Sequence, residues 1–367
     1  MEMVQNNPYA RHHLIKSKNI TKGVAFIIFI LVAIIAKIFL LKVLPDKYLF
    51  DSNHIIGICN GANGYGDKAY EFTASIFTPL VRLFHINNAK TGSIILGLIL
   101  NPILLLVMYK KLPWKINFID CIFISLLLFL LNIYVFNISK DLVQFVIDLI
   151  ALAFIKKVKN KKIQTILVSL TFIIFSILFR SYLAIIGIIY LYIKIFNSKK
   201  FDKKVFIVFT ILLFIAVTAS LYYTNNSIFN SIFNNRDNTN KYRTDSVNAQ
   251  TIINNLINKD GYIFEILNYL INLIRLIFPI ELVLRGNILY LLFLIFNILT
   301  LVTIVLQRKK IKESDTLNSI FILFIAFALV FALFEPDFGS FLRHFIPIAF
   351  IMIIMTLYLP LRRKLYE

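Results

Sequence analysis

Residues 23–44 read GVAFIIFILVAIIAKIFLLKVL, an apolar run interrupted only by Lys37 and Lys42. A helix of this length can cross the hydrocarbon core of a bilayer, which takes about 20 residues. The run is too long for the apolar part of a signal peptide and lacks a small-residue cleavage site. We therefore predict a first membrane-spanning helix here, after a polar and basic N-terminal segment.

Similar runs recur along the 367-residue chain, which is 59% hydrophobic and 16% charged. Soluble domains contain about 45–50% apolar and about 25% charged residues, so the composition excludes an ordinary soluble fold. Two cysteines are too few for a disulfide scaffold or a cysteine zinc module. We predict an all-α, polytopic integral membrane protein, one transmembrane domain over residues 1–367, with about ten spans (roughly 9–12). The nine further spans are expected at 92–109, 116–137, 142–155, 163–179, 182–196, 205–222, 288–306, 317–334 and 345–360.

The net charge of +20 is distributed in short clusters between the apolar runs. With the N-terminus inside, the inner segments hold 24 Lys and Arg against five acids, and the outer segments 13 against twelve. Cytoplasmic loops are the ones enriched in Lys and Arg, so both termini are predicted to be cytoplasmic. No basic face alternates with stacking aromatic residues, so nucleic acid is not an expected partner.

Two long segments lie on the predicted outer side, a first outer loop at 45–91 and a large outer loop at 223–287. Loops of this length usually carry function. Within the second loop, residues 262–284 are apolar but place polar side chains at helical spacing: Glu265, Asn268, Asn272 and Arg275. We predict an amphipathic helix that is re-entrant or lies in the outer interface, with this stripe facing a cavity. The alternative is an eleventh span.

Ionisable residues gather in three short outer turns: 139–141 (SKD), 179–182 (FRSY) and 335–344 (EPDFGSFLRH). A charged group at the centre of a spanning helix costs about 2.5–3.5 kcal/mol, so residues kept near the membrane usually have a role. In the last turn, Ser340 is expected to cap the next helix and to place Arg343 and His344 in its first turn. The alternative is an arginine–carboxylate clamp that only fixes the loop.

Three short motifs, Gly66-Asp67-x-x-Tyr70, Phe179-Arg180-Ser181-Tyr182 and the 335–344 segment, resemble the Wzy-type membrane polymerases of bacterial O-antigen, capsule and exopolysaccharide repeat units. The resemblance implies a multi-pass glycosyltransferase of the bacterial inner membrane. Such an enzyme uses undecaprenyl-diphosphate-linked oligosaccharide as both donor and acceptor. It implies no cofactor and no metal, and a chain-length regulator as a candidate partner.

The resemblance suggests roles for individual residues. Arginine binds phosphate through two parallel hydrogen bonds and keeps its charge, so converging arginines suit a diphosphate leaving group. The candidate diphosphate-binding residues are Arg180, Arg343, Arg275 and Arg285, with Lys140 and Arg243 as secondary candidates. The candidate bases for the acceptor hydroxyl are His344 and Glu335, with Asp67 and Asp337 behind them.

Three other functions remain open from the sequence. A membrane glycosyltransferase (GT-C-like architecture) using a lipid-phosphate sugar would employ an acid of the first outer loop, Asp46, Asp51 or Asp67. A polysaccharide transporter or flippase would use deep charges, for which Lys37 and Asp148 are the candidates. A membrane acyltransferase would need a reactive histidine facing an acyl donor.

Overall fold

The computed structural model describes residues 19–64, 66–198, 218–220, 222–223, 251–257, 259, 261–284 and 288–358. These residues are mostly helical, in agreement with the predicted all-α membrane fold. A short antiparallel pair joins β1 (Asn19–Thr21) to β2 (Lys115–Asn117) at one end of the helices. Of the predicted span 205–222, the described residues include only 218–220 and 222.

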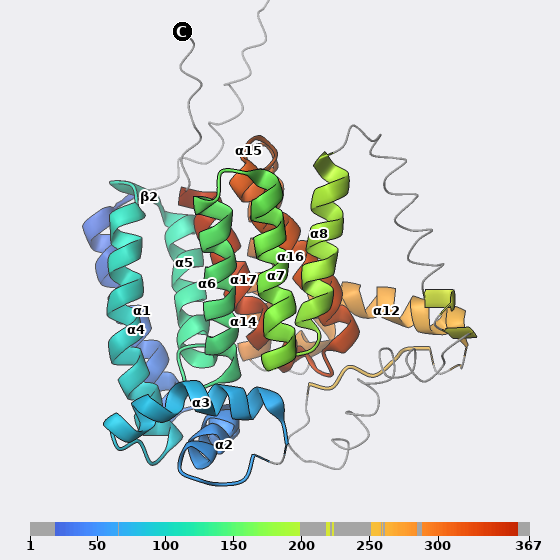
Figure 1. Cartoon of the computed structure of the whole chain (residues 1–367). Coiled ribbons are helices and arrows are strands. Elements are labelled where there is room, and N and C mark those ends of the chain that lie inside the picture. The colour runs from blue at the N-terminus through green and yellow to red at the C-terminus, as the bar shows by residue number, and fades with distance from the viewer. Residues whose placement is uncertain are drawn as a thin grey trace, which may run out of the picture.

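Upright helices form a bundle, and shorter helices lie at its two ends (Figure 1). Turns separate the long helices from one another. Asn, Ser and Asp side chains in these turns cap the next helix, because they accept hydrogen bonds from free N–H groups at its start. The helices are α1 (Lys22–Lys42), α2 (Phe50–Cys59), α3 (Lys68–Leu83), α4 (Ala89–Lys111), α5 (Phe118–Tyr134), α6 (Lys140–Lys157), α7 (Lys161–Leu178), α8 (Leu183–Ser198), α12 (Tyr262–Ile277), α13 (Ile280–Val283), α14 (Ile288–Leu306), α15 (Arg308–Glu313), α16 (Asp315–Phe334) and α17 (Phe338–Tyr358), with a 3-10 turn η2 (Asp46–Leu49) before α2.

Five of the described helices are long and apolar enough to cross a membrane: α1, α4, α7, α16 and the main part of α17. Helices α5, α8 and most of α14 are apolar but shorter. Helix α6 runs beside them in the bundle and carries buried polar side chains, among them Gln144 and Asp148. The chain is therefore a helical membrane-embedded protein.

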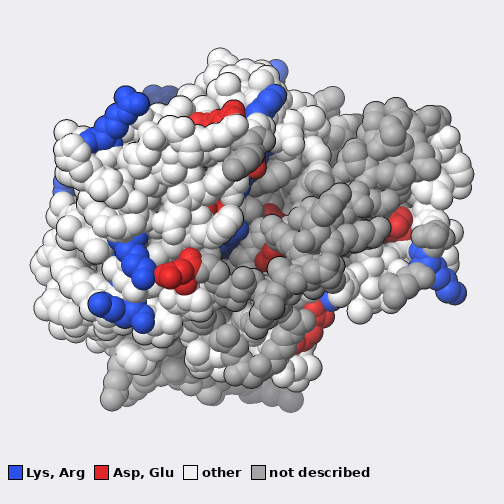
Figure 2. Space-filling model, turned by 90° about the horizontal axis from the view of Figure 1, so that it is seen from below, with Lys and Arg blue, Asp and Glu red and all other residues white. Residues whose placement is uncertain are grey.

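The two ends of the bundle differ in structure and charge. The segments predicted to lie inside, including β2, the α6–α7 turn and α15, are at one end (Figure 1). Helices α2 and α3 lie across the opposite end, where the predicted outer turns also fall. Seen from that end, acidic and basic atoms lie near one another on an otherwise largely uncharged face (Figure 2). The described segments expected inside and the expected outer turns thus lie at opposite ends of the bundle.

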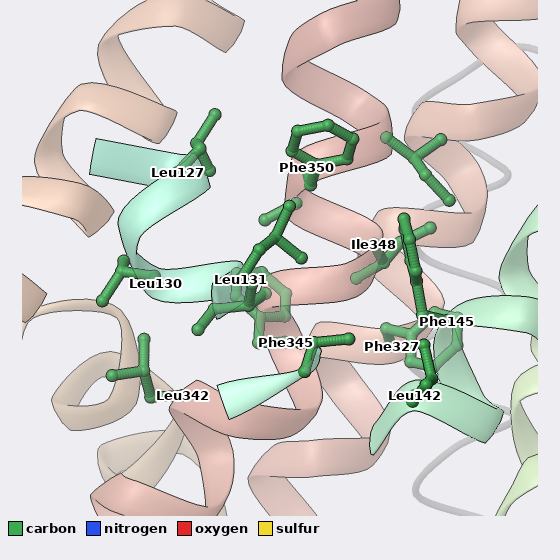
Figure 3. Packing of buried hydrophobic residues seen from close by; sticks show 14 of the residues in the cluster. Leu127, Leu130, Leu131, Leu142, Phe145, Phe327, Leu342, Phe345, Ile348 and Phe350 are labelled. Carbon is green, nitrogen blue, oxygen red and sulfur yellow. The ribbon is translucent and has the colours of Figure 1, made fainter. Parts of the chain in front are cut away.

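The core is built around α17, which packs against α5, α6, α14 and α16. Most of its spanning window is buried inside the protein, whereas α1 keeps much of its surface exposed. Figure 3 shows the contact region, where Leu131, Leu142, Phe145, Phe345 and Phe350 interdigitate. Such packing of large side chains holds membrane helices together because lipid gives no hydrophobic driving force between them.

Helix α17 begins earlier than predicted. The expected cap at Ser340 puts the start at 341, before the apolar span predicted at 345–360, but the helix starts at Phe338 after its cap, Asp337. Arg343 and His344 therefore lie in the second turn and not in the first. The Asp337 side chain, and not that of Ser340, accepts the capping bond, from Ser340 N at 2.8 Å. A short carboxylate one residue before the helix is well placed for free N–H groups.

Helix α12 lies across the direction of the bundle helices (Figure 1), as an interfacial or re-entrant segment would. Its exposed side carries apolar residues such as Ile263 and Ile274. Its polar stripe faces residues 254–257 of the chain: Asn268 bonds both the N–H and the carbonyl of Ile257, and Asn272 bonds Asn255.

Candidate functional site

Four ionisable side chains from three separate turns converge at the end of the bundle near α2 and α3. Asp141 comes from the first turn of α6, Arg180 from the α7–α8 turn, Glu335 from the end of α16, and His344 from α17. All four are buried, with residue exposures of 2%, 9%, 3% and 8%. Buried charges of both signs are costly unless they pair, so their partners decide what the site can do.

His344 is held at both ring nitrogens. Its Nδ1 lies 2.6 Å from Glu335 Oε1. Its Nε2 lies 2.9 Å from Arg180 Nη2 and 3.2 Å from Asp141 Oδ1. A carboxylate that orients a histidine through one ring nitrogen, so that the other nitrogen exchanges the proton, is the usual arrangement of a general base.

The two contacts of Nε2 suit different protonation states. A guanidinium can only donate, so the neutral imidazole must accept from Arg180 at Nε2 and donate from Nδ1 to Glu335. An ionised carboxylate can only accept, so the protonated imidazole can donate from Nε2 to Asp141. The imidazole therefore has a partner before and after it takes up a proton.

Arg180 links the turns through its planar fork. Its Nη1 donates to Tyr182 Oη at 3.0 Å, and its Nη2 lies 3.5 Å from Asp141 Oδ1. The guanidinium also lies over the ring of Phe179, 4.9 Å from its centroid. The Tyr182 ring packs in turn against Phe331 and Phe334. Aromatic packing of this kind excludes water and strengthens the charge interactions inside.

A second group of charges adjoins the first. Arg343 Nη1 donates to Asp51 Oδ2 of α2 at 3.0 Å, and the Tyr70 hydroxyl of α3 donates to the other oxygen of Asp51. The Lys140 ammonium lies 3.5 Å from the centroid of the Tyr70 ring. The Arg343 side chain is 32% exposed, against 16% for Asp51. Arg343 is thus the more exposed side chain of the pair, and an incoming anion can reach its guanidinium.

The electrostatics of the turns keep acids ionised. Burial favours the neutral form of Asp51, but Arg343, Lys140 and the Tyr70 hydroxyl outweigh it and lower the Asp51 pKa. Burial also opposes ionisation of Glu335, yet His344, Ser340 and Arg180 lower its pKa. Burial together with the negative charge of Asp51 raises the pKa of Tyr70, so this phenol stays protonated.

Two predicted bases have structural duties. Asp67 caps α3 by accepting from Ala69 N and Tyr70 N. Asp337 caps α17 and also accepts from the Thr251 hydroxyl. Both carboxylates are therefore engaged in holding the start of a helix.

The predicted arginines separate into two groups. Arg180 and Arg343 belong to the cluster. Arg275 pairs with Glu281 through two hydrogen bonds of 2.8 and 2.9 Å and also bonds the carbonyl of Asn254. Arg285 and Arg243 lie outside the described residues.

Asp141 is the residue whose importance the sequence analysis missed, while Asp51 was expected as an acid of the first outer loop and not as the partner of Arg343. Although Lys140 and Asp141 are neighbours in the SKD turn, Asp141 faces Arg180 and His344 while Lys140 contacts Tyr70. One signal was available: Asp141 opens an apolar helix at the same membrane level as Arg180. The partner of Asp51 is nearly three hundred residues away in sequence, and no local pattern reveals it.

The two deep charges do not form a pair with each other. The Lys37 ammonium donates to Ser93 Oγ, Asn137 Oδ1 and the carbonyl of Phe136, near the end of α5. Asp148 accepts from Gln144 within α6. Lys37 is thus held by neighbouring polar groups of the bundle, whereas Asp148 is bonded through one carboxyl oxygen, Oδ1, and its buried Oδ2 has no partner among the described residues.

Within the described ranges, no group of three or more His, Cys, Asp or Glu side chains is placed to hold a metal ion. No protein-family model, curated protein or solved structure matches the chain.

Proposed function

We propose that the chain is a membrane glycosyltransferase that joins oligosaccharide repeat units carried on undecaprenyl diphosphate, at the outer leaflet of the bacterial inner membrane. The growing glycan is transferred from its lipid diphosphate to a sugar hydroxyl of the next lipid-linked unit. The products are O-antigen, capsule or exopolysaccharide chains.

The observation that carries the proposal is the position of His344 Nε2 between Arg180 and Asp141. A diphosphate that binds the Arg180 guanidinium draws it away from the imidazole and leaves the Nε2 lone pair available. Asp141 then accepts the hydrogen bond of the imidazolium once the proton has arrived. Donor binding and activation of the base are coupled in this arrangement.

The reaction balances with these residues. The acceptor oxygen forms a bond to the anomeric carbon of the donor, and the bond from that carbon to the diphosphate oxygen breaks. The hydroxyl proton goes to His344 Nε2, and Glu335 stabilises the resulting charge through Nδ1. Arg180 and Arg343 stabilise the negative charge that develops on the leaving diphosphate. One displacement by one base inverts the anomeric centre.

The test is a polymerisation assay with purified full-length protein and lipid-linked repeat units isolated from the source organism, with the products separated on a gel. Wild-type protein should produce a ladder. Arg180→Ala and Arg343→Ala should each lower the rate by about 10²–10³-fold, the usual cost of one lost charge-stabilising donor. Arg82→Ala is the matched control, because Arg82 is exposed at the end of α3.

Size-exclusion profiles and melting temperatures separate folding defects from catalytic ones, and Arg343→Lys provides a milder variant. Wild-type ladders from both alanine variants would contradict the arginine assignment. Incorporation from a monosaccharide phospholipid, with no ladder from the diphosphate units, would instead indicate a lipid-phosphate-sugar transferase.

A further inference from the structure

An apolar groove runs along the bundle between α4, α6 and α17 and encloses about 470 Å³. This volume lies within the range of about 300–1,000 Å³ that ligand sites occupy. Several residues on its walls are exposed although they are large and apolar, including Ile103, Val107, Val146 and Leu149. In a membrane the groove therefore opens sideways toward lipid.

The walls of the groove are in helical register with the charged cluster. On α17, Phe350 and Ile354 follow Arg343 by seven and eleven residues, so all three share one face. Ile351 and Met355 follow His344 at the same spacing. The face of α17 that carries the candidate base and the exposed arginine thus continues as a wall of the groove.

Helix α6 repeats this relation. Phe145, Leu149 and Leu152 follow Asp141 by four, eight and eleven residues and line the groove. Leu142, the neighbour of Asp141, lies at the cluster end of the same wall. Two of the three walls therefore lead from the buried charges into an apolar channel.

Among the described residues that line the groove, the charged ones are Lys111 and Lys156, in the last turns of α4 and α6. They lie at the end away from the cluster. Between the two charged ends, the wall residues are apolar over the length of α6. A molecule that matches this pattern has an anionic head at the cluster and a long hydrocarbon chain.

We infer that the groove holds the polyprenyl chain of the lipid diphosphate, with the diphosphate at Arg343 and the chain directed along α6 and α17. The inference rests on the proposed function and extends it to the lipid part of the substrate. A larger groove of about 590 Å³ lies between α1 and α4, but neither helix carries a residue of the cluster.

The experiment uses a polyprenyl diphosphate with a photoreactive diazirine in its chain, added to full-length protein in nanodiscs, followed by peptide mapping. Cross-links should fall on groove residues of α4, α6 and α17, and unlabelled polyprenyl diphosphate should compete. Val146→Trp and Leu149→Trp fill the groove and should lower labelling by about tenfold. An overpacked contact weakens binding of the lipid chain by about that factor.

The matched controls are Ile166→Trp and Leu170→Trp on α7, which have similar exposure and lie away from the groove. They should label like the wild type. Cross-links confined to the α1–α4 groove or to α12 would overturn the inference. So would equal competition by phosphatidylglycerol, which would identify a phospholipid held by Lys111 and Lys156.

The two proposals fail in different ways. A gel ladder together with cross-links elsewhere would overturn the groove assignment and leave the polymerase. Specific labelling of the groove, without transfer from any lipid-linked unit, would leave the lipid site and overturn the polymerase.

Discussion

His344 is the residue for which the geometry gives the sharpest expectation. His344→Asn removes Nε2 as a proton acceptor, and the loss of a general base lowers rates by about 10²–10⁴-fold. We therefore expect the polymerisation rate to fall by that amount at neutral pH, measured from initial ladder intensity.

The control for this change is His85→Asn, in the exposed turn between α3 and α4. His85 has a positive φ of 49°, a conformation that Asn accepts readily. This variant should polymerise like the wild type. Equal activity of the two variants would show that another residue is the base, and Glu335 is then the next candidate.

Glu335 should make the folded protein sensitive to acid. Its pKa is lowered in the folded state because the surrounding charges outweigh burial. A carboxyl with a lowered folded pKa contributes stability above its unfolded pKa, about 4.3 for Glu, and loses it as the pH falls through the folded value. The melting temperature in detergent should therefore fall between about pH 5 and pH 2.

Glu335→Gln tests the assignment, since an amide does not titrate. The variant should be less stable than the wild type at pH 7 and should show a shallower fall with acid. Asp120→Asn on α5 is a control outside the cluster. Identical pH profiles for Glu335→Gln and wild type would show that another acid governs the loss of stability at low pH.

At the level of elements, α12 holds a chain segment against the functional turn. Asn268 bonds Ile257, while Ile253 N bonds the carbonyl of Pro336, next to Glu335. Asn268→Ala leaves the N–H and carbonyl of Ile257 without these bonds, at a cost of about 1–3 kcal/mol. Amide hydrogen exchange over 251–257 should accelerate accordingly.

Leu267→Ala is the control for this prediction, since Leu267 lies on the exposed side of α12. It removes apolar surface without touching the segment, so exchange over 251–257 should be unchanged. Equal acceleration in both variants would mean that α12 is destabilised as a whole.

The helices themselves were predictable because their apolar runs exceed the length that ordinary globular helices require. The polar stripe of α12 was predictable from the spacing of its residues. Its partner was not predictable, because sequence periodicity carries no information about which chain segment lies opposite a helix. The stripe forms hydrogen bonds with the backbone of 254–257. The start of α17 was predicted three residues late because Ser340 was expected to be the cap in place of Asp337. Asp51 and Glu335, the partners of Arg343 and His344, make charges acceptable within that helix.

For the molecule as a whole, the expected orientation places the end with α2 and α3 outside the cell. Asn87→Cys, before α4, should react with a membrane-impermeant maleimide on intact cells. Lys159→Cys, in the α6–α7 turn, should react only after lysis. The native Cys59 and Cys121 are buried and should give little background. The reverse pattern would place the cluster in the cytosol and contradict the proposed function.

The charge asymmetry between the ends could be predicted from sequence because orientation depends on short basic loops, which are local features. The site could be predicted only in part. Arg180, Arg343, Glu335 and His344 stand out as charges beside apolar runs, and they do converge. The roles of Asp141 and Asp51 depend on contacts with helices that lie far away in the sequence.

Helix α17 is both the last described helix and the centre of the core, and this order has a consequence for biogenesis. A ribosome releases Asp141 and Arg180 long before it completes α17. Until then the acid and the arginine lack the imidazole that later joins them. A nascent chain therefore carries an incomplete electrostatic core until α17 has been made and has packed against the earlier helices.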